Sequence, residues 1–270
     1  MSANTAFQLV NEKGWRRGFA NILRQENANW WGSRRWWLNV LIWLAIVNGM
    51  ILAMLTTAHS EGNFVMTPAM LLNEALTILV VTTGLFGAVG TVIVMQGSMI
   101  DEKQSGTAAW IMSKPVSRTA FIIAKLVANM IALPLIIVIV QSAVAYVQIT
   151  SRDGMTLEFG PFLAGIALIC LNMLFYLTFT LMLGTLFRDR GPVIGIPLAI
   201  IFVPMFAVNI FGQVAYLTPW LIMPAGNEPG LAVQAMSSLP LTTIMPILAT
   251  IVWIVVFVVI AIWRFKREEF

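Results

Sequence analysis

The sequence holds few side chains that could do covalent or metal chemistry. His59 is the single histidine and Cys170 the single cysteine. A membrane-embedded b-type haem needs a pair of axial histidines, and a zinc site needs several nitrogen or sulfur ligands. An intramembrane serine protease needs a serine beside a base, whereas the expected topology puts His59 in the first external loop. We therefore expect no catalytic residue, no metal and no cofactor.

The sequence also lacks an energy source of its own. It contains no Gly-x-x-x-x-Gly-Lys-Ser/Thr loop, the motif that cradles nucleotide phosphates. Ion-coupled transporters place charged residues inside their spans, whereas we expect Glu74 and Lys125 to reach the interface from span ends. The apolar segments hold uncharged amides instead, which we expect to hydrogen-bond between helices. These amides are Asn48, Gln96, Asn129, Gln141, Asn172 and Asn209.

One polar segment, "DEKQSGTAAWIMSKPVSR" at 101–118, interrupts the apolar sequence. We expect Asp101 and Glu102 to stand near the start of a short helix, where carboxylates favour the helix dipole. Residues 108–112 can continue that helix, and Pro115 ends it because proline removes a backbone donor. A short rigid helix held below a membrane is suited to receiving force from a partner protein.

The elements around this segment are those of a membrane protein. Hydrophobic residues make up 59 % of the 270 positions, charged residues 10 %, and the mean hydropathy is +0.86. Soluble domains carry about 25 % charged residues. No ionisable residue occurs from Leu38 to Ala58 or from Leu241 to Trp263, and roughly 20 apolar helical residues cross the hydrocarbon core. Because these runs do not alternate with period two, we predict an all-α polytopic membrane protein.

We predict two regions in the chain. Region 1–37 forms a cytoplasmic amphipathic elbow helix and an aromatic belt, and region 38–270 forms a single domain of six spans. Prolines interrupt 214–240 every few residues, so we predict short re-entrant helices there rather than a seventh span. The six predicted spans are 38–57, 71–98, 119–149, 161–187, 191–213 and 241–263.

The basic residues predict the sidedness. Six spans place 15 of the 16 Lys and Arg residues on one side of the membrane and only Arg152 on the other. The positive-inside rule makes the basic side cytoplasmic. We therefore expect a multi-pass protein of a prokaryotic plasma membrane, with both termini in the cytoplasm and no cleaved signal peptide. The net charge of +4 then needs no nucleic acid, because anionic membrane lipids supply the counter-charge.

The elbow helix is predicted for residues 5–25. On a helical wheel its apolar residues gather within about 100°, a pattern typical of a helix lying in the interface. We expect its apolar face to lie in lipid and its basic face to lie on the headgroups. Either it only anchors the chain, or it also touches a cytoplasmic partner. The apolar face contains Trp15, Phe19, Ile22 and Leu23, and the basic face Lys13, Arg16, Arg17 and Arg24. The aromatic belt is formed by Trp30, Trp31, Trp36 and Trp37.

At the polar segment the sequence resembles a known family, the permease subunits of type-2 ABC exporters. Their loop after the second span commonly reads Glu, Gly-Thr, an apolar run, Ser-x-Pro-Val-Ser-Arg and a later Lys. The corresponding residues here are Glu102, Gly106, Thr107, Ser113, Pro115, Val116, Ser117, Arg118 and Lys125. Trp110 and Met112 stand where many members have leucine. The residue-level similarity covers about 25 positions, and the pattern of elbow helix, six spans and re-entrant passage covers nearly the whole chain.

The resemblance implies a non-catalytic half-transporter. Segment 101–118 would be a coupling helix that docks on a separate ATP-binding subunit. Two such subunits would work with two permeases, as a homodimer or a similar heterodimer, with the substrate path between the permeases. The expected polar docking residues are Asp101, Glu102, Lys114 and Arg118. The other loop residues, expected to pack or to shape the loop, are Gly106, Thr107, Trp110, Ile111, Ser113 and Pro115.

Three alternatives stay open at this point. The chain could be a membrane scaffold or assembly factor that recruits a protein through the same loop, or a secondary transporter. The loop could also do no more than end two helices and supply positive charge to the cytoplasmic side. A substrate path without fixed charges favours an apolar or amphipathic substrate, such as a lipid, a drug or a hydrophobic peptide, and does not identify it.

Overall fold

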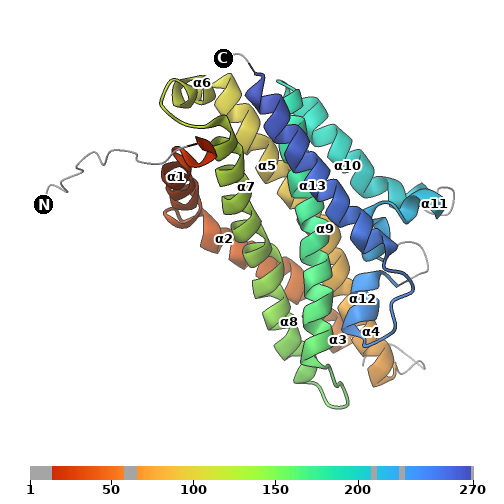
Figure 1. Ribbon diagram of the computed structural model, residues 1–270. Helices are drawn as coiled ribbons and strands as arrows, with labels where there is room; N and C mark the ends of the chain where they lie inside the picture. The colour runs from red at the N-terminus through yellow and green to blue at the C-terminus, as the bar shows by residue number, and fades with distance from the viewer. Residues whose placement is uncertain (1–13, 58–65, 208–211, 225–228, 269–270) are drawn as a thin grey trace, which may run out of the picture.

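The computed structural model describes residues 14–57, 66–207, 212–224 and 229–268. Within these ranges every regular secondary-structure element is a helix, and there is no strand. Figure 1 shows the helices as one elongated bundle. The α-helices are α1 (Phe19–Trp31), α2 (Arg35–Trp43), α3 (Gly49–Thr57), α4 (Pro68–Val80), α5 (Gly87–Gln104), α6 (Thr107–Met112), α7 (Arg118–Pro134), α8 (Val140–Thr150), α9 (Phe159–Leu186), α10 (Arg190–Ala207), α11 (Gly212–Ala215), α12 (Leu231–Met236) and α13 (Met245–Lys266). Two short 3₁₀ helices are η1 (Gly14–Arg16) and η5 (Pro219–Ile222), and three π-helical segments are η2 (Leu44–Asn48), η3 (Val81–Phe86) and η4 (Leu135–Ile139).

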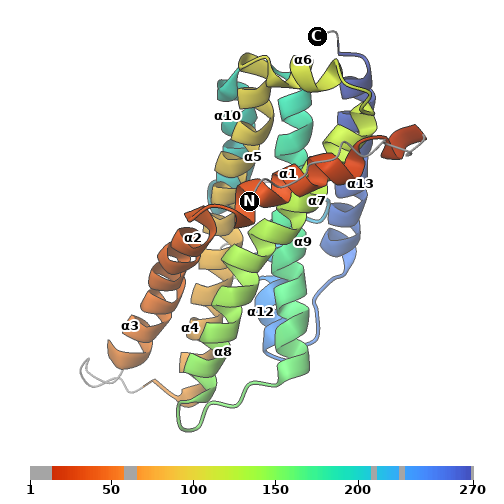
Figure 2. The ribbon, with the colours of Figure 1, turned by 90° about the vertical axis from the view of Figure 1, so that its left-hand side faces the viewer.

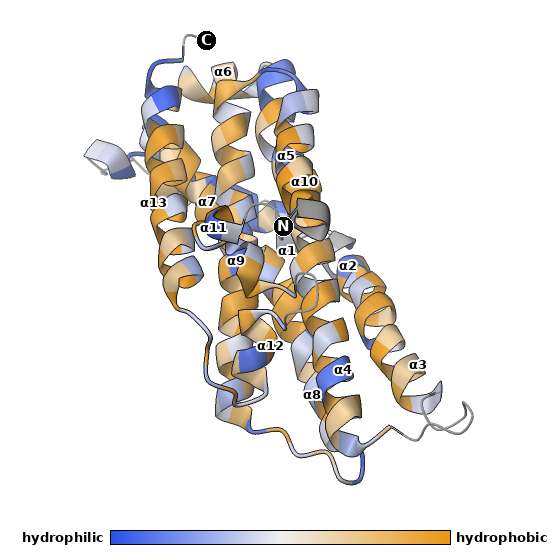
Figure 3. Ribbon diagram, turned by 90° about the vertical axis from the view of Figure 1, so that its right-hand side faces the viewer, coloured by the Kyte–Doolittle hydropathy of each residue, from blue (hydrophilic) through white to orange (hydrophobic). Residues whose placement is uncertain are grey.

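Five helices of the described chain are long and apolar enough to cross a membrane. Three of them are continuous through the π-helical segments, which join α2 to α3, α4 to α5 and α7 to α8. Figure 3 shows these helices as mostly hydrophobic, with hydrophilic segments near both ends of the bundle. Five of the six predicted spans coincide with these helices. The five helices are Trp36–Thr57, Pro68–Gln104, Arg118–Thr150, Phe159–Leu186 and Met245–Lys266.

The sixth predicted span, 191–213, lies partly outside the described residues. Helix α10 is described as Arg190–Ala207, and within it Arg190–Val203 is an apolar helix shorter than the five long ones. Residues 208–211 lie outside the described residues, and α11 follows them. The count of six spans therefore stays an expectation.

Helix α9 lies at the centre of the bundle. It packs against α5, α12 and α13, and most of its residues are buried. Polar contacts join the spans as predicted, because Asn172 Nδ2 donates to the Gly84 carbonyl at 3.2 Å and Asn48 Nδ2 donates to Gln141 Oε1 at 3.2 Å. Of the other predicted amides, Asn129 accepts a bond from Trp30, whereas Gln96 Oε1 is buried and has no partner among the described residues. The last amide, Asn209, lies outside the described residues.

The predicted re-entrant passage is built of short pieces. Helices η5 and α12 follow α11, and α12 packs against α9 and α4 near the end of the bundle opposite α6 (Figure 1). Two tryptophans attach the passage to its neighbours: Trp220 Nε1 donates to the Ile200 carbonyl at 3.0 Å, and Trp253 Nε1 donates to the Leu217 carbonyl at 2.9 Å. The frequent prolines keep each helical piece short.

Gly165 allows α9 and α12 to approach closely. A Cβ at Gly165 would lie 2.7 Å from the Ala232 carbonyl oxygen and would also overlap the Met236 side chain. We therefore expect Gly165→Ala to lower the free energy of unfolding by about 1–3 kcal/mol, the usual range for overpacking. Denaturant unfolding in detergent measures this change. Gly160→Ala is the control on the same helix, because a Cβ there meets nothing within 4 Å; equal losses in both variants would contradict the prediction.

Candidate functional site

The polar segment begins as the end of a long helix. Helix α5 continues through Asp101 and Glu102 to Gln104, so the two acids lie in its last turns. The prediction that they begin a short helix was wrong. The chain turns at Ser105 and Gly106, and Gly106 has the left-handed φ of 72° that glycine adopts without strain. This turn separates α5 from α6.

Helix α6 presents a distinct outer surface. Trp110 is 64 % exposed, and Lys114 Nζ lies 5.0 Å from the centre of its ring. Ser113 and Pro115 are also exposed, whereas Ile111 packs against the core. We call Trp110, Ser113, Lys114 and Pro115 the α6 surface. It stands at one end of the bundle, together with the C-terminal end of α13 (Figures 1 and 2).

The end of α5 is tied to the α9–α10 link. Arg190 Nη2 lies 2.6 Å from Asp101 Oδ1, and Lys103 Nζ donates to the Thr185 carbonyl at 3.2 Å. Lys103 Nζ also lies 2.9 Å from Glu268 Oε1, beyond the end of α13. These contacts hold the end of α5 against the end of α9, the start of α10 and the residues that follow α13.

The Asp101–Arg190 pair is exposed, at 55 % and 53 % of the two side chains. Exposed pairs contribute about 0–1 kcal/mol because water screens them. We therefore expect Asp101→Asn to change the free energy of unfolding by less than about 1 kcal/mol. Denaturant unfolding in detergent checks this value, and a loss as large as that of a buried charge would contradict it.

The link between α6 and α7 is held on two sides. Ser117 N donates to the Arg17 carbonyl at 2.9 Å, and Arg118 Nη1 donates to the Lys266 carbonyl at 2.6 Å. A Cβ at Gly18 would lie 2.9 Å from the Val116 side chain, so the turn before α1 packs tightly on this link. Arg118, predicted to dock a partner, therefore anchors the segment to α13.

Among the described residues the elbow helix α1 runs from Phe19 to Trp31, so it ends later than predicted. Residues 1–13 lie outside the described residues, η1 is a single turn, and α1 starts after Gly18, whose φ is 81°. Trp15 is 49 % exposed, with the Arg16 guanidinium 5.4 Å from the centre of its ring. Arg17 and Arg24 are exposed as well.

The apolar face of α1 does not lie wholly in lipid. Ile22 is buried, and Phe19 and Leu23 pack against the core of the bundle. The prediction that this face lies in lipid was therefore wrong for these side chains. Because α1 packs on α7, its apolar residues cover protein surface instead. Figure 2 shows α1 crossing in front of α7.

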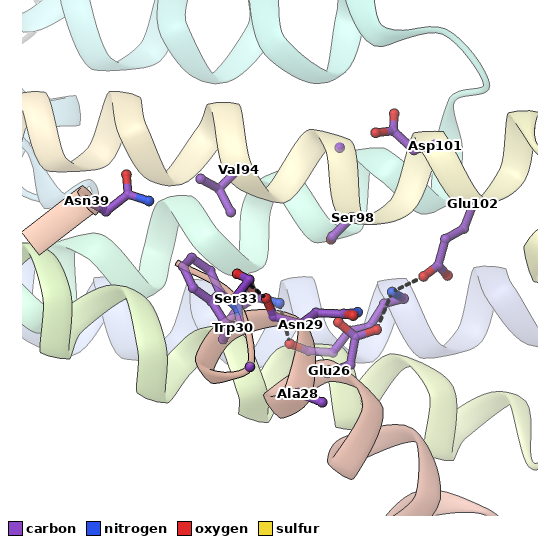
Figure 4. Close-up of a pocket in the computed structure, with 14 residues that line it drawn as sticks. Glu26, Ala28, Asn29, Trp30, Ser33, Asn39, Val94, Ser98, Asp101 and Glu102 are labelled. Carbon is purple, nitrogen blue, oxygen red and sulfur yellow. Dashed lines mark hydrogen bonds and ion pairs between the residues drawn. The ribbon is translucent and has the colours of Figure 1, made fainter. Parts of the chain in front are cut away.

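Lys125 lies at the centre of a buried ion cluster. Its side chain is 1 % exposed, and its Nζ lies 2.6 Å from Glu26 Oε1 and 2.7 Å from Glu102 Oε1 (Figure 4). The cluster joins α7, α1 and α5. The prediction that Lys125 reaches the interface was wrong, because its side chain is buried. Glu102, predicted to dock a partner, instead points to this lysine. We call Glu26, Glu102 and Lys125 the Lys125 cluster.

Sequence reasoning did not identify the Lys125 cluster. Lys125 carried one signal, since charges within apolar segments are rare and are usually paired. Glu26 carried no signal, because nothing in the sequence places it opposite a residue 99 positions away.

An open polar cavity of about 760 Å³ adjoins the cluster. Residues from α1, α2, α5 and α7 line it, among them Asn29, Asn39 and Ser98 (Figure 4). Trp30 Nε1 donates to Asn129 Oδ1 at 3.1 Å in its wall. Three carboxylates and one ammonium line the cavity, and no group of three or more His, Cys, Asp or Glu residues among the described residues could hold a metal ion.

The fold and this site define a class: a polytopic α-helical membrane protein with a short helix in a polar segment between its second and third spans. The family model for the ABC-2 family transporter protein matches residues 20–270, and the chain belongs to this family. The predicted resemblance is confirmed. The chain is therefore an ABC transporter membrane subunit, of a family that is generally non-catalytic. It is also similar to the uncharacterized transmembrane protein YxlG of Bacillus subtilis (strain 168), at 26 % identity over 196 residues, or 71 % of this chain and 73 % of that relative.

Proposed function

We propose that this chain is the permease of an ATP-driven exporter and that its α6 surface docks on a separate ATP-binding subunit. Family membership supports the transporter class. The observation that carries the proposal is the exposure of Trp110 on a short helix that is firmly attached to the bundle. A large apolar side chain exposed at a polar end of a protein suits a protein interface.

We restrict the proposed docking residues to those exposed on the α6 surface. The α6 surface offers an exposed tryptophan, a residue type enriched among interface hot spots, beside the exposed Lys114 and Pro115. Asp101 is also exposed but is paired with Arg190. Glu102, Ile111 and Arg118 contact other parts of the chain, and in this proposal they support the α6 surface from within.

The α6 end of the bundle is the cytoplasmic end in this proposal. Lys114, Arg118 and the basic residues that end α13 lie at this end, in agreement with the positive-inside rule. The exposed arginines of the elbow, Arg16, Arg17 and Arg24, would contact lipid headgroups. We further propose the plasma membrane of a prokaryote, which is consistent with the bacterial relative.

Two permeases and two ATP-binding subunits would form the working transporter. Two spans are largely uncovered by the rest of the chain: in the most apolar 18-residue stretch of each, only 22 % is buried. These spans are Trp36–Thr57 and Met245–Lys266. Lipid and a second permease, either identical or similar, would cover these faces. The charged side chains of the described spans lie near their ends or pair internally, which favours an apolar or amphipathic substrate.

Purification of the tagged chain from its own host in mild detergent tests the proposal. We expect an ATP-binding subunit to co-purify in near-equal amount. After reconstitution into vesicles, we expect the complex to move a substrate across the membrane in an ATP-dependent manner. An ATP-binding subunit retained without any substrate movement would favour a scaffold. Loss of every ATP-binding protein in several detergents would overturn the proposal.

A further inference from the structure

The Lys125 cluster connects the three elements that surround the polar segment. Lys125 comes from α7, Glu102 from the last turns of α5, and Glu26 from the middle of α1. Each carboxylate lies within 2.7 Å of the same ammonium group. Charge-assisted hydrogen bonds of this length are the strong ones in proteins.

The position of Glu102 depends on this one lysine. Glu102 Oε1 binds Lys125, while Oε2 is buried and has no hydrogen-bond partner among the described residues. The turn at Ser105 and Gly106 follows directly, and α6 begins at Thr107. Lys125 therefore holds the end of α5 just before the chain enters α6.

The second carboxylate closes a ring of contacts around the segment. Glu26 belongs to α1. In the turn before α1, the Arg17 carbonyl accepts a hydrogen bond from the Ser117 N–H. The segment 101–118 is thus held at one end by α1, through Lys125, and at the other end by the turn before α1, through this backbone bond.

We propose that Lys125 is a positioning residue that makes α1, the end of α5 and α7 move as one unit. A movement that the ATP-binding subunit imposes on α6 then reaches the spans instead of bending the turn at Ser105 and Gly106. The inference rests on the proposed function, since it needs a partner that moves α6. It assigns to Glu26 and Lys125 a role in force transfer rather than in docking.

A neutral variant tests this role without leaving a buried charge. Glu26→Gln, Glu102→Gln and Lys125→Met are combined, so the shape is kept while the ionic contacts are lost. Amide hydrogen exchange of the complex with its ATP-binding subunit is compared between nucleotide-free and ATP-bound states. The readouts are α6, which reports docking, and α12 at the opposite end of the bundle, which reports transmitted movement.

In the unaltered complex we expect ATP to change the exchange of both α6 and α12. In the neutral variant the change at α6 should persist, whereas the change at α12 should fall at least threefold. Lys125→Arg should retain more than half of the α12 change, because a guanidinium can also bind two carboxylates. A contact that only stabilises the fold would lower the melting temperature and leave the α12 response intact.

The outcomes separate the inference from the proposed function. A full α12 response in the neutral variant overturns the inference while the proposed function stands. Absence of any ATP-dependent change in the unaltered complex, at α6 as well as at α12, overturns the proposed function and the inference with it. Should the neutral variant not accumulate, Glu26→Met alone removes the hydrogen bond from Lys125 to α1 and leaves the Lys125–Glu102 pair, and an unreduced α12 response in it likewise counts against the inference.

Discussion

Lys125→Met is expected to lower the free energy of unfolding by about 3–5 kcal/mol, the usual cost of removing one partner of a buried ion pair. Lys125 is 1 % exposed and is the ionic partner of both Glu26 and Glu102. Methionine keeps most of the volume but leaves two carboxylates without a counter-charge. Denaturant titration of the purified chain in detergent, followed by helical circular dichroism, measures the change.

Two controls identify the cause of this loss. Arg24→Met removes a basic residue from α1 at an exposed position, and exposed substitutions usually stay within about 0.5 kcal/mol. The neutral combination of Glu26→Gln, Glu102→Gln and Lys125→Met should recover most of the loss, because no charge is then left buried. A Lys125→Met variant as stable as the unaltered chain would show that water reaches the Lys125 cluster.

Trp110→Ala is expected to weaken binding of the ATP-binding subunit by about 30-fold or more. Trp110 is the largest exposed side chain of the α6 surface, at 64 %. Interface tryptophans are often hot spots worth about 2 kcal/mol or more, and 1.4 kcal/mol corresponds to a factor of ten in affinity. Equilibrium binding of the purified permease in nanodiscs to its labelled ATP-binding subunit measures the dissociation constant.

The matched control for this substitution is Trp37→Ala. Trp37 is 38 % exposed and belongs to α2, away from the α6 surface. Its substitution should leave the dissociation constant within about twofold, since energetically important side chains cluster at the centre of an interface. Equal affinity of the Trp110→Ala variant and the unaltered chain would place the docking surface elsewhere.

The spans could be predicted because the membrane imposes strong local constraints. Each backbone amide in lipid must bond within its own segment, so an apolar run of sufficient length becomes a helix. Five of the six predicted spans are helices in the structure, with ends shifted by a few residues. The region 191–213 is described as helix only from Arg190 to Ala207, so a sixth span there stays a prediction.

Asp101 and Glu102 show how a local rule was outweighed. Acidic residues favour a helix start through the dipole, an effect of about 0.3–1 kcal/mol. Nothing between the apolar part of α5 and Gln104 breaks the helix, and adding a residue to an existing helix is easier than nucleating a new one. The helix therefore continued to the turn at Gly106, and the acids gained ionic partners there.

The sequence by itself determined the class of the molecule and the family to which its polar segment points. These properties depend on composition and on residues close together in the chain, and physical rules for them hold without knowing the fold. Only the tertiary structure decided that Lys125 is buried between Glu26 and Glu102, and that Trp110 rather than Glu102 faces outward. Those outcomes depend on how α1 packs across α7 and α5, and such contacts between distant segments follow from the packing of the whole bundle.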